Sequence, residues 1–321
     1  MGDPAGVGGE VLVRALADRD RRSKARYMIH GSSHAMHQAA DAVGVEPFWW
    51  RVDGRSAMAS TADLHDVVLL DSDPQLIDEG VDVRFRSSAT KLGGRLSFEW
   101  VERAIADTKR AHDDPRRADA IVTGPINKQA WALAGKKRYP GHTELLTQLA
   151  TVHIPLFEIR DKLTIGAVHS AIDLGHQACL GLGFARPRIA VCGLNPHAGE
   201  DGLMGDEEGR IISPAIEHAV NSGIVASGPY PADTIFNAAV EGKFDLVVAM
   251  YHDQGLIPVK LLERDLAVNV TLGLPTVRTS PDHGTAFDIA GQGIADAGSM
   301  CNAIDLAVKM AANARSVQVI E

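Results

Sequence analysis

The sequence is poor in cysteine. Its 321 residues include three cysteines, Cys179, Cys192 and Cys301, and no Cys-x-x-Cys pair. An odd number without paired spacing argues against a disulfide framework and against a zinc site built on thiolates. This usage is typical of proteins from a reducing compartment, so we expect a cytoplasmic protein.

The sequence also lacks an excess of positive charge and any long apolar run. Its formal net charge is −9, whereas a phosphate backbone requires a basic face, so we expect no nucleic-acid partner. No apolar run is long enough to span a bilayer and the N-terminus has no signal-peptide pattern, so we expect no membrane partner. The basic clusters at 19–22 and 136–138 are expected to lie in solvated helix ends or loops.

Nucleotide-binding motifs are absent as well. No Gly-x-Gly-x-x-Gly follows a strand and there is no Walker lysine, so we expect no Rossmann fingerprint. The chain instead alternates short apolar runs with amphipathic stretches, which predicts an α/β protein with a mostly parallel sheet. The predicted strands are 27–31, 67–71, 118–123, 188–193, 244–249 and 267–272. The predicted helices include one that ends near 18 and those at 95–109, 165–182, 206–221 and 296–314, whereas 228–234 and 277–285 are predicted as loops.

Three histidines follow predicted strands or lie close to their ends: His153, His197 and His252. Ligands of open α/β sheets bind at the carboxyl ends of strands, so we expect these imidazoles to meet. Three neutral imidazoles with an open position suit a divalent cation, which acts as a Lewis acid on a hydroxyl or carbonyl. Asp253, beside His252, is either a general base or a group that orients the ligands.

A second group of polar side chains suggests an anionic ligand. Lys260, Asn269 and Arg278 come from consecutive segments and together suit a doubly charged group such as a phosphate. His142 and Thr143 follow a Pro-Gly turn, which either only starts a helix or presents them at an anion-binding helix N-terminus. From these residues alone, we expect a metal-dependent α/β enzyme that acts on a small anion.

Other clusters of histidines are expected to be structural. His30, His34 and His37 lie close together in the sequence, but no carboxylate accompanies His34 and His37. His169 and His176 have metal-compatible spacing with Asp173, but they lie mid-helix opposite its apolar face. We therefore expect a solvated helix surface there.

Seven motifs follow one another along nearly the whole chain. They are G-D-P-A-G at 2–6, T-G-P-I-N-K at 123–128, Y-P-G-H-T-E at 139–144, G-L-N-P-H-A-G-E at 193–200, P-A-D-T at 231–234, M-Y-H-D-Q-G at 250–255 and R-T-S-P-D-H-G-T at 278–285. In this combination the chain resembles the 4-hydroxythreonine-4-phosphate dehydrogenase family of pyridoxal-phosphate biosynthesis. That family includes paralogues that act on four-carbon sugar-acid 4-phosphates.

The resemblance implies a fold like that of isocitrate and isopropylmalate dehydrogenases. Two α/β lobes in an α/β/α arrangement would flank a cleft, with the NAD site built from loops. The first lobe would comprise 1–125 and about 270–321, and the second about 126–269. The second lobe would carry the metal ligands and the interface of a homodimer, with the metal site shared between subunits.

The resemblance also implies roles for individual residues. A divalent metal such as zinc, magnesium or cobalt would be bound by His153, His197 and His252. The phosphorylated substrate would be contacted by His142, Thr143, Lys260, Asn269 and Arg278. Catalysis would depend on Asp233, Asp253 and Lys260. The reaction would be oxidation of 4-phosphohydroxy-L-threonine by NAD or NADP at the C3 hydroxyl, followed by decarboxylation to 3-amino-2-oxopropyl phosphate.

Alternative functions and two departures accompany this resemblance. D-threonate and D-erythronate 4-phosphate dehydrogenases, which yield dihydroxyacetone phosphate, share the metal and phosphate residues. A relative acting on aromatic dihydrodiol dicarboxylates fits less well, because the phosphate-binding residues are present. A non-catalytic metal-binding or ligand-sensing protein is an alternative of another class. The family pattern has a strand before the first motif and a longer segment where Leu149 here precedes Ala150.

Overall fold

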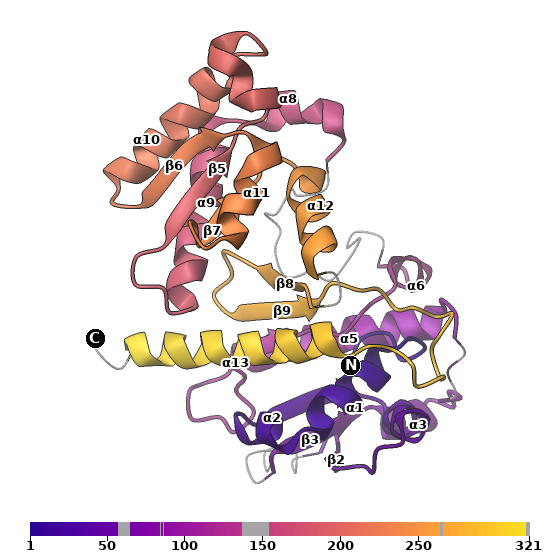
Figure 1. The fold of residues 1–321 in the computed structure, drawn as a ribbon. Coiled ribbons are helices and arrows are strands. Elements are labelled where there is room, and N and C mark those ends of the chain that lie inside the picture. The colour runs from indigo at the N-terminus through magenta and orange to yellow at the C-terminus, as the bar shows by residue number, and fades with distance from the viewer. Residues whose placement is uncertain (57–64, 84, 86, 137–153, 264–265, 319–321) are drawn as a thin grey trace. The chain divides into compact units, whose positions relative to one another are not determined.

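The computed structural model describes all residues except 57–64, 84, 86, 137–153, 264–265 and 319–321 (Figure 1). The chain forms two compact units. Unit 1 comprises Met1–Leu149 and Asp265–Ala311, and unit 2 comprises Ala150–Arg264 and Ala312–Glu321. Among the helices of the described residues, none is long and apolar enough to cross a bilayer.

The first sheet of unit 1 is parallel, with the order β1-β3-β2. Its strands are β1 (Tyr27–Gly31), β3 (Val67–Asp71) and β2 (Trp50–Asp53), and the first two have the predicted bounds. Helices α1 (Gly8–Ala17) and α3 (Ser33–Val43) pack against each other and share one buried apolar cluster with Ile29 and Leu69 of this sheet. The short helices α2 (Arg19–Ser23) and α4 (Asp73–Asp78) follow α1 and β3.

The second sheet of unit 1 has the order β4-β9-β8. β4 (Ala120–Val122) is parallel to β9 (Val277–Pro281), and β8 (Val268–Thr271) is antiparallel to it. The prediction of a loop at 277–285 was therefore wrong in its first half. The polar residues of β9 misled it, because their side chains are buried with partners. Thr279 Oγ1, for example, donates to the carbonyl oxygen of Ala303 in α13 (Gly298–Gln318) at 2.8 Å.

The two compact units divide the chain at other residues than the lobes that the resemblance implies. Helix α6 (Lys128–Leu133), which we assigned to the second lobe, belongs to unit 1. The indole nitrogen of Trp131 donates to Ser97 Oγ of α5 (Lys91–Thr108) at 2.9 Å, and its ring lies edge-on to Phe98. Trp131 is completely buried, so α6 is packed on α5 and is part of the same core.

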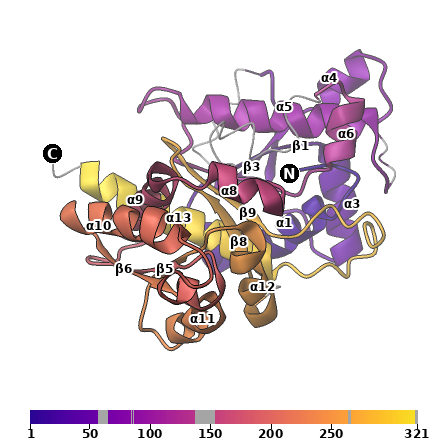
Figure 2. The same cartoon turned by 90° about the horizontal axis from the view of Figure 1, so that it is seen from above.

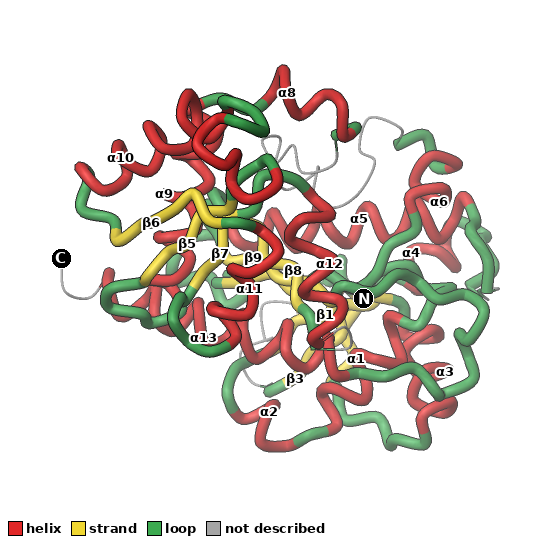
Figure 3. Tube along the Cα trace, turned by 45° about the horizontal axis from the view of Figure 1, so that its top comes forward, coloured by secondary structure: helices red, strands yellow, loops and turns green. Residues whose placement is uncertain are grey.

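Unit 2 is built on a parallel sheet with the order β6-β5-β7, whose strands lie side by side in Figure 3. The strands are β6 (Val225–Tyr230), β5 (Arg188–Cys192) and β7 (Leu246–Val248). Alternate residues of β5 face opposite sides: Ile189 and Val191 pack against α9 and α10, and Ala190 and Cys192 pack against α11. The helices themselves can be followed in Figure 2. These helices are α9 (Ile165–Gly181), α10 (Ser213–Asn221) and α11 (Ala232–Val240).

The remaining elements of unit 2 are short turns and one longer helix. They are a 3-10 turn at Leu156–Glu158, α8 (Ile159–Lys162), a second 3-10 turn at Pro196–Gly202, a π-helical turn at Glu208–Ile212 and α12 (His252–Glu263). The prediction of a loop at 228–234 was wrong for its first residues, which belong to β6. β6 is an edge strand, where Pro229 removes no ladder bond that the sheet requires.

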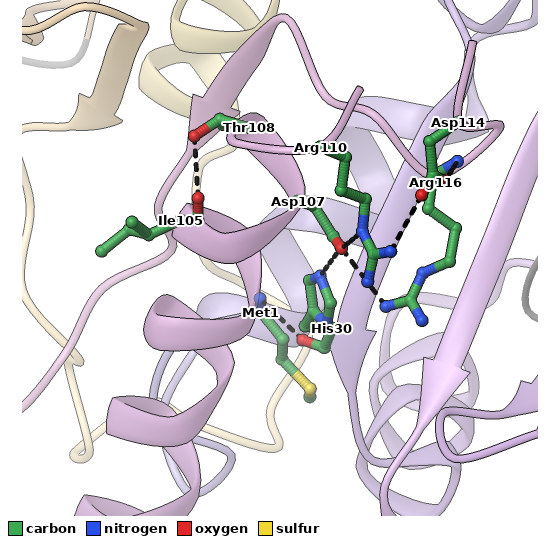
Figure 4. A network of polar contacts seen from close by, with 8 residues as sticks. All are labelled: Met1, His30, Ile105, Asp107, Thr108, Arg110, Asp114 and Arg116. Atoms are coloured by element: carbon green, nitrogen blue, oxygen red, sulfur yellow. Dashed lines mark hydrogen bonds and ion pairs between the residues drawn. The ribbon is translucent and has the colours of Figure 1, made fainter. Parts of the chain in front are cut away.

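A buried polar network accounts for His30 (Figure 4). His30 Nε2 lies 2.9 Å from Asp107 Oδ2, and Arg110 and Arg116 contact the same carboxylate at 2.6 and 3.3 Å. Burial lowers the pKa of His30, which favours the neutral ring. Burial raises the pKa of Asp107, but hydrogen bonds from His30 and Arg110 outweigh it, so that the pKa is lowered overall. His30 therefore has a structural role, as expected.

Asp3 gives the first testable prediction. Its carboxyl group is fully buried, and burial raises its pKa from 3.8 to about 6, although the Ala5 N–H donates to it. Because folding raises the pKa of Asp3, ionising its carboxyl group costs more free energy in the folded than in the unfolded state. This loss of stability is absent below about pH 4, where the group is protonated in both states, and complete above about pH 7, where it is ionised in both. Asp3→Asn keeps an oxygen for Ala5 and should raise the free energy of unfolding by about 3 kcal/mol at pH 8.

Urea unfolding at pH 4 and pH 8 measures this effect. The exposed Asp113→Asn is the control and should leave stability unchanged at both values. An equal effect of Asp3→Asn at pH 4 and pH 8 would contradict the assignment.

Candidate functional site at the carboxyl edge of the unit 2 sheet

Histidine and aspartate side chains that can bind a metal or transfer a proton lie at one edge of the sheet in unit 2. His197 follows β5, Asp233 follows β6, and His252 and Asp253 follow β7. These three strands are parallel neighbours, so their carboxyl ends lie at the same edge. The structure thus brings four of the predicted site residues to one edge of a single sheet.

The loop that carries His197 has an uncommon backbone. Residues His197, Ala198, Gly199, Glu200 and Asp201 all have positive φ angles, between 45° and 83°. Each non-glycine residue in this left-handed region costs roughly 1 kcal/mol or more. Such a turn persists only where neighbouring groups hold it, so its conformation depends on contacts from outside the loop.

His252 is the first residue of α12, and its ring is oriented by its neighbour. His252 Nδ1 lies 2.7 Å from Asp253 Oδ1. A carboxylate on one ring nitrogen fixes the tautomer and makes the other nitrogen the candidate metal ligand. We considered two roles for Asp253, a general base and a group that orients the ligands. This arrangement favours the second.

The two candidate metal ligands that the structure describes, His197 and His252, fit a divalent metal. Two imidazoles on adjacent strand ends, one of them paired with a carboxylate, are the ligand type that zinc and cobalt prefer. His153, His142 and Thr143 lie outside the described residues. Within the described part of the chain, no group of three or more His, Cys, Asp or Glu side chains forms a metal site.

Asn269 and Arg278 lie on one face of the second sheet of unit 1. Thr271 pairs with Arg278 across β8 and β9, and Asn269 precedes Thr271 by two residues, so all three side chains share a face. Arg278 is completely buried and donates to Thr271 Oγ1 at 3.0 Å and to Thr123 Oγ1 at 2.6 Å. The two hydroxyls fix the plane of the guanidinium. Lys260 belongs to unit 2, exposed on α12.

Unit 1 contains a cavity large enough for part of a dinucleotide. Its volume is about 510 Å³, and it lies against the first turn of α1, the α3 helix and the loop at 290–291. Glu10 holds that loop by accepting from the backbone N–H groups of Gly291 and Gly293, at 2.5 and 2.9 Å. The lining residues include Gly6, Gln38, Asp41 and Ser87, and no lysine or arginine is among those described.

Sequence reasoning missed Glu208, which contacts the His197 loop as Gln254 does, and the two threonines Thr123 and Thr271, which hold Arg278. Gln254 and Thr123 do lie inside two of the seven motifs, which was a signal. Glu208 had none, because a glutamate in a polar segment is normally a solvated residue.

The comparison with protein families decides the identity. The family model described as "Pyridoxal phosphate biosynthetic protein PdxA" matches residues 23–150 and 145–307. The chain belongs to the PdxA family. The two matched stretches meet at 145–150, where the sequence departs from the family pattern by the short Leu149–Ala150 connection.

Curated relatives of this PdxA-family chain carry two names. It is 43% identical to a 4-hydroxythreonine-4-phosphate dehydrogenase of Beijerinckia indica, covering 97% of this chain and 93% of that protein. It is 40% identical to a D-threonate 4-phosphate dehydrogenase of Cupriavidus necator, covering 97% and 96%. Both are dehydrogenases, so the PdxA-family member studied here is an oxidoreductase.

Solved structures agree with the α/β fold. The 4-hydroxythreonine-4-phosphate dehydrogenase of Klebsiella pneumoniae is 36% identical with a TM-score of 0.78, and the alignment covers 97% of this chain and 96% of that one. A terephthalate 1,2-cis-dihydrodiol dehydrogenase of Burkholderia xenovorans has a TM-score of 0.63 at 24% identity, covering 96% of each chain. The second likeness concerns the fold alone.

Proposed function

We propose that this PdxA-family member is a metal-dependent dehydrogenase that oxidises 4-phosphohydroxy-L-threonine at its C3 hydroxyl and releases carbon dioxide. The product is 3-amino-2-oxopropyl phosphate. The observation that carries the proposal is the position of His197 and His252 at the ends of adjacent parallel strands. The names of the relatives supply the substrate.

We propose that His153 completes the metal site with His197 and His252. A divalent ion held by these residues would supply Lewis-acid polarisation of the C3 oxygen, and NAD or NADP would supply the hydride acceptor. Asp253 keeps the His252 ring in place, with 2.7 Å between Oδ1 and Nδ1. Asp233, in the first turn of α11, takes up the hydroxyl proton as C3 becomes a carbonyl.

Lys260 acts in the second half of the reaction. The oxidised substrate is a β-keto acid, so breaking the bond to its carboxylate leaves an electron pair that is shared between C2 and the carbonyl oxygen. A proton must then reach C2, and the Lys260 ammonium supplies it. Lys260 lies eight residues after His252 on the same helix, α12.

We propose that polar and cationic side chains recognise the phosphate, among them Asn269, Arg278 and Lys260. Asn269 and Arg278 share one face of their sheet. His142 and Thr143 complete the set. Arg278 suits the role because a planar guanidinium matches two phosphate oxygens at once.

We propose that the cavity of about 510 Å³ in unit 1 holds the dinucleotide. Peptide N–H groups in the first turn of α1 face an anion favourably, which suits a pyrophosphate. Asp41 at the cavity can accept from ribose hydroxyls. The carboxylate would repel a 2′-phosphate, so the cavity favours NAD over NADP.

This preference gives a second prediction. The wild-type protein should use NAD at least 10-fold more efficiently than NADP, measured as the ratio of kcat/KM values. Asp41→Asn removes the repelling charge and should reduce that ratio several-fold without changing the KM of the phosphorylated substrate. Asp20→Asn, an exposed carboxylate at α2, is the control and should leave the ratio unchanged. A wild-type preference for NADP would contradict the cofactor assignment.

We also propose a homodimer with the metal site at its interface. Helix α12 exposes Ile257, Val259, Leu261 and Leu262 beside Lys260. Exposed apolar side chains gathered on one helix mark a protein interface more often than a solvated surface. A second copy of unit 2 is the partner that would bury them.

The second candidate substrate is D-threonate or D-erythronate 4-phosphate, with dihydroxyacetone phosphate as the product. The relative at 40% identity that bears the D-threonate name favours it almost as strongly as the first. NADH formation with all three substrates, by metal-loaded protein, separates the candidates. A clear preference for the amino acid supports the first proposal, and a clear preference for a sugar acid supports the second. Silence with all three would overturn both.

A further inference from the structure

We propose that Glu208 and Gln254 are positioning residues for the metal site. Together, as the loop clamp, they hold the His197 loop in its left-handed turn and tie it to the His252 helix. The proposal rests on the proposed metal site and adds two residues that would bring the imidazoles to their places before a metal binds. Neither residue is itself expected to touch the metal or the substrate.

Glu208 is buried and contacts the start of the His197 loop with both oxygens. Its Oε1 accepts from the backbone N–H groups of Leu194 and Asn195, at 2.8 and 2.7 Å. Its Oε2 accepts from Asn195 Nδ2 at 2.9 Å. Two backbone donors on a carboxylate oxygen are charge-assisted bonds, which are stronger than neutral ones. They fix the chain where it leaves β5.

The fit of Glu208 against the loop is close. A Cβ atom at Gly199, whose φ is +83°, would lie 2.7 Å from Glu208 Oε2. The carboxylate therefore packs under the middle of the left-handed turn as well as bonding to its start. A turn with four non-glycine residues at positive φ needs such an external support to remain in one conformation.

Gln254 joins this loop to the other histidine. Its Nε2 donates to the carbonyl oxygen of Gly193 at 2.8 Å, and its Oε1 accepts from the N–H of Met250 at 2.6 Å. Gly193 precedes His197 by four residues, and Met250 and Gln254 flank His252. The buried side-chain amide of Gln254 thus fixes the position of the segment that carries His197 relative to the segment that carries His252.

The test measures Co²⁺ affinity in full-length protein, from the visible absorption of the bound ion. Loss of a group that orients metal ligands typically costs about 10- to 100-fold in metal affinity. We expect Glu208→Ala and Gln254→Ala each to raise the Co²⁺ Kd by about that factor. Glu208→Gln keeps one oxygen for the two backbone donors and should restore part of the affinity. Glu207→Ala is the control: Glu207 accepts from the Asn195 side chain at 2.8 Å, a bond that does not involve the loop backbone, and its loss should change the Kd less than about 3-fold.

A second measurement separates positioning from general stability. With Co²⁺ raised well above the weakened Kd, the kcat of Glu208→Ala and Gln254→Ala should return close to the wild-type value, while the KM for NAD stays constant throughout. A merely structural role would lower the folded fraction and leave the Kd of the folded molecules unchanged. If the wild type binds Co²⁺ and both variants bind it with the same Kd, the clamp is overturned and the metal site is not. A wild type that binds no Co²⁺ would overturn the metal site and the clamp together.

Discussion

Replacing His252 with alanine should lower kcat/KM about 1000-fold and remove most of the bound metal. The proposed metal stabilises the developing charge on the C3 oxygen, and such Lewis-acid stabilisation is worth several kcal/mol, of which about 4 kcal/mol corresponds to this factor. His252 begins a helix at an exposed strand end, so the fold does not depend on its ring. NADH formation and the metal content of the purified variant are measured together.

A matched variant excludes a general effect of losing an imidazole. His218 is an exposed histidine of α10 in the same unit, and His218→Ala should retain both the activity and the metal. Asp253→Asn removes the charge that orients His252. The metal affinity of this variant should lie between those of His252→Ala and His218→Ala. An active His252→Ala variant with a full complement of metal would show that His252 is not a ligand.

Arg278→Met should lower kcat/KM for the phosphorylated substrate about 1000-fold. Truncating one partner of a buried charge pair costs between about 2 and 5 kcal/mol, and we expect about 4 kcal/mol. Methionine fills a similar volume, so the packing between β4 and β8 is largely kept. Arg278→Lys retains the charge but not the planar fork, and should lose about 30-fold.

The dephosphorylated substrate separates phosphate recognition from a structural role. If Arg278 contacts the phosphate, the kcat/KM values of Arg278→Met for the phosphorylated and the dephosphorylated substrate should be almost equal. The wild type should strongly prefer the phosphorylated substrate. Thr271→Val removes one of the two hydroxyls that accept from Arg278, at 3.0 Å, and should lose part of the preference for the phosphorylated substrate. A variant that loses activity but keeps the full preference for the phosphate would contradict this role.

The strands and helices that could be predicted were those with apolar periodicity. β1 and β3 are continuous apolar runs, and α9 has one buried face, so their patterns determine their structure locally. β9 and β6 could not be predicted in this way. Arg278 and Thr279 are buried in β9 because distant partners satisfy them, and no local pattern reveals such partners.

The positions of His197 and His252 at strand ends could be predicted from the sequence, whereas the groups that contact their segments could not. The rule that ligands bind at carboxyl ends of strands led to His197 and His252, because both follow recognisable strands. Glu208 acts at a distance of 14 residues from Leu194, through a bond that only the folded chain creates. The spacing of a motif gives the position of a functional side chain, whereas the groups that hold it depend on tertiary structure.

Removal and return of the metal is the most direct test of the whole account. The purified protein is treated with a chelator, freed of it, and assayed for NADH formation from 4-phosphohydroxy-L-threonine and from the two sugar-acid 4-phosphates, before and after addition of Zn²⁺, Mg²⁺ or Co²⁺. The account predicts no NADH without metal, and recovery on metal addition with a phosphorylated substrate. NADH formation at an undiminished rate in protein shown to contain no metal would contradict it.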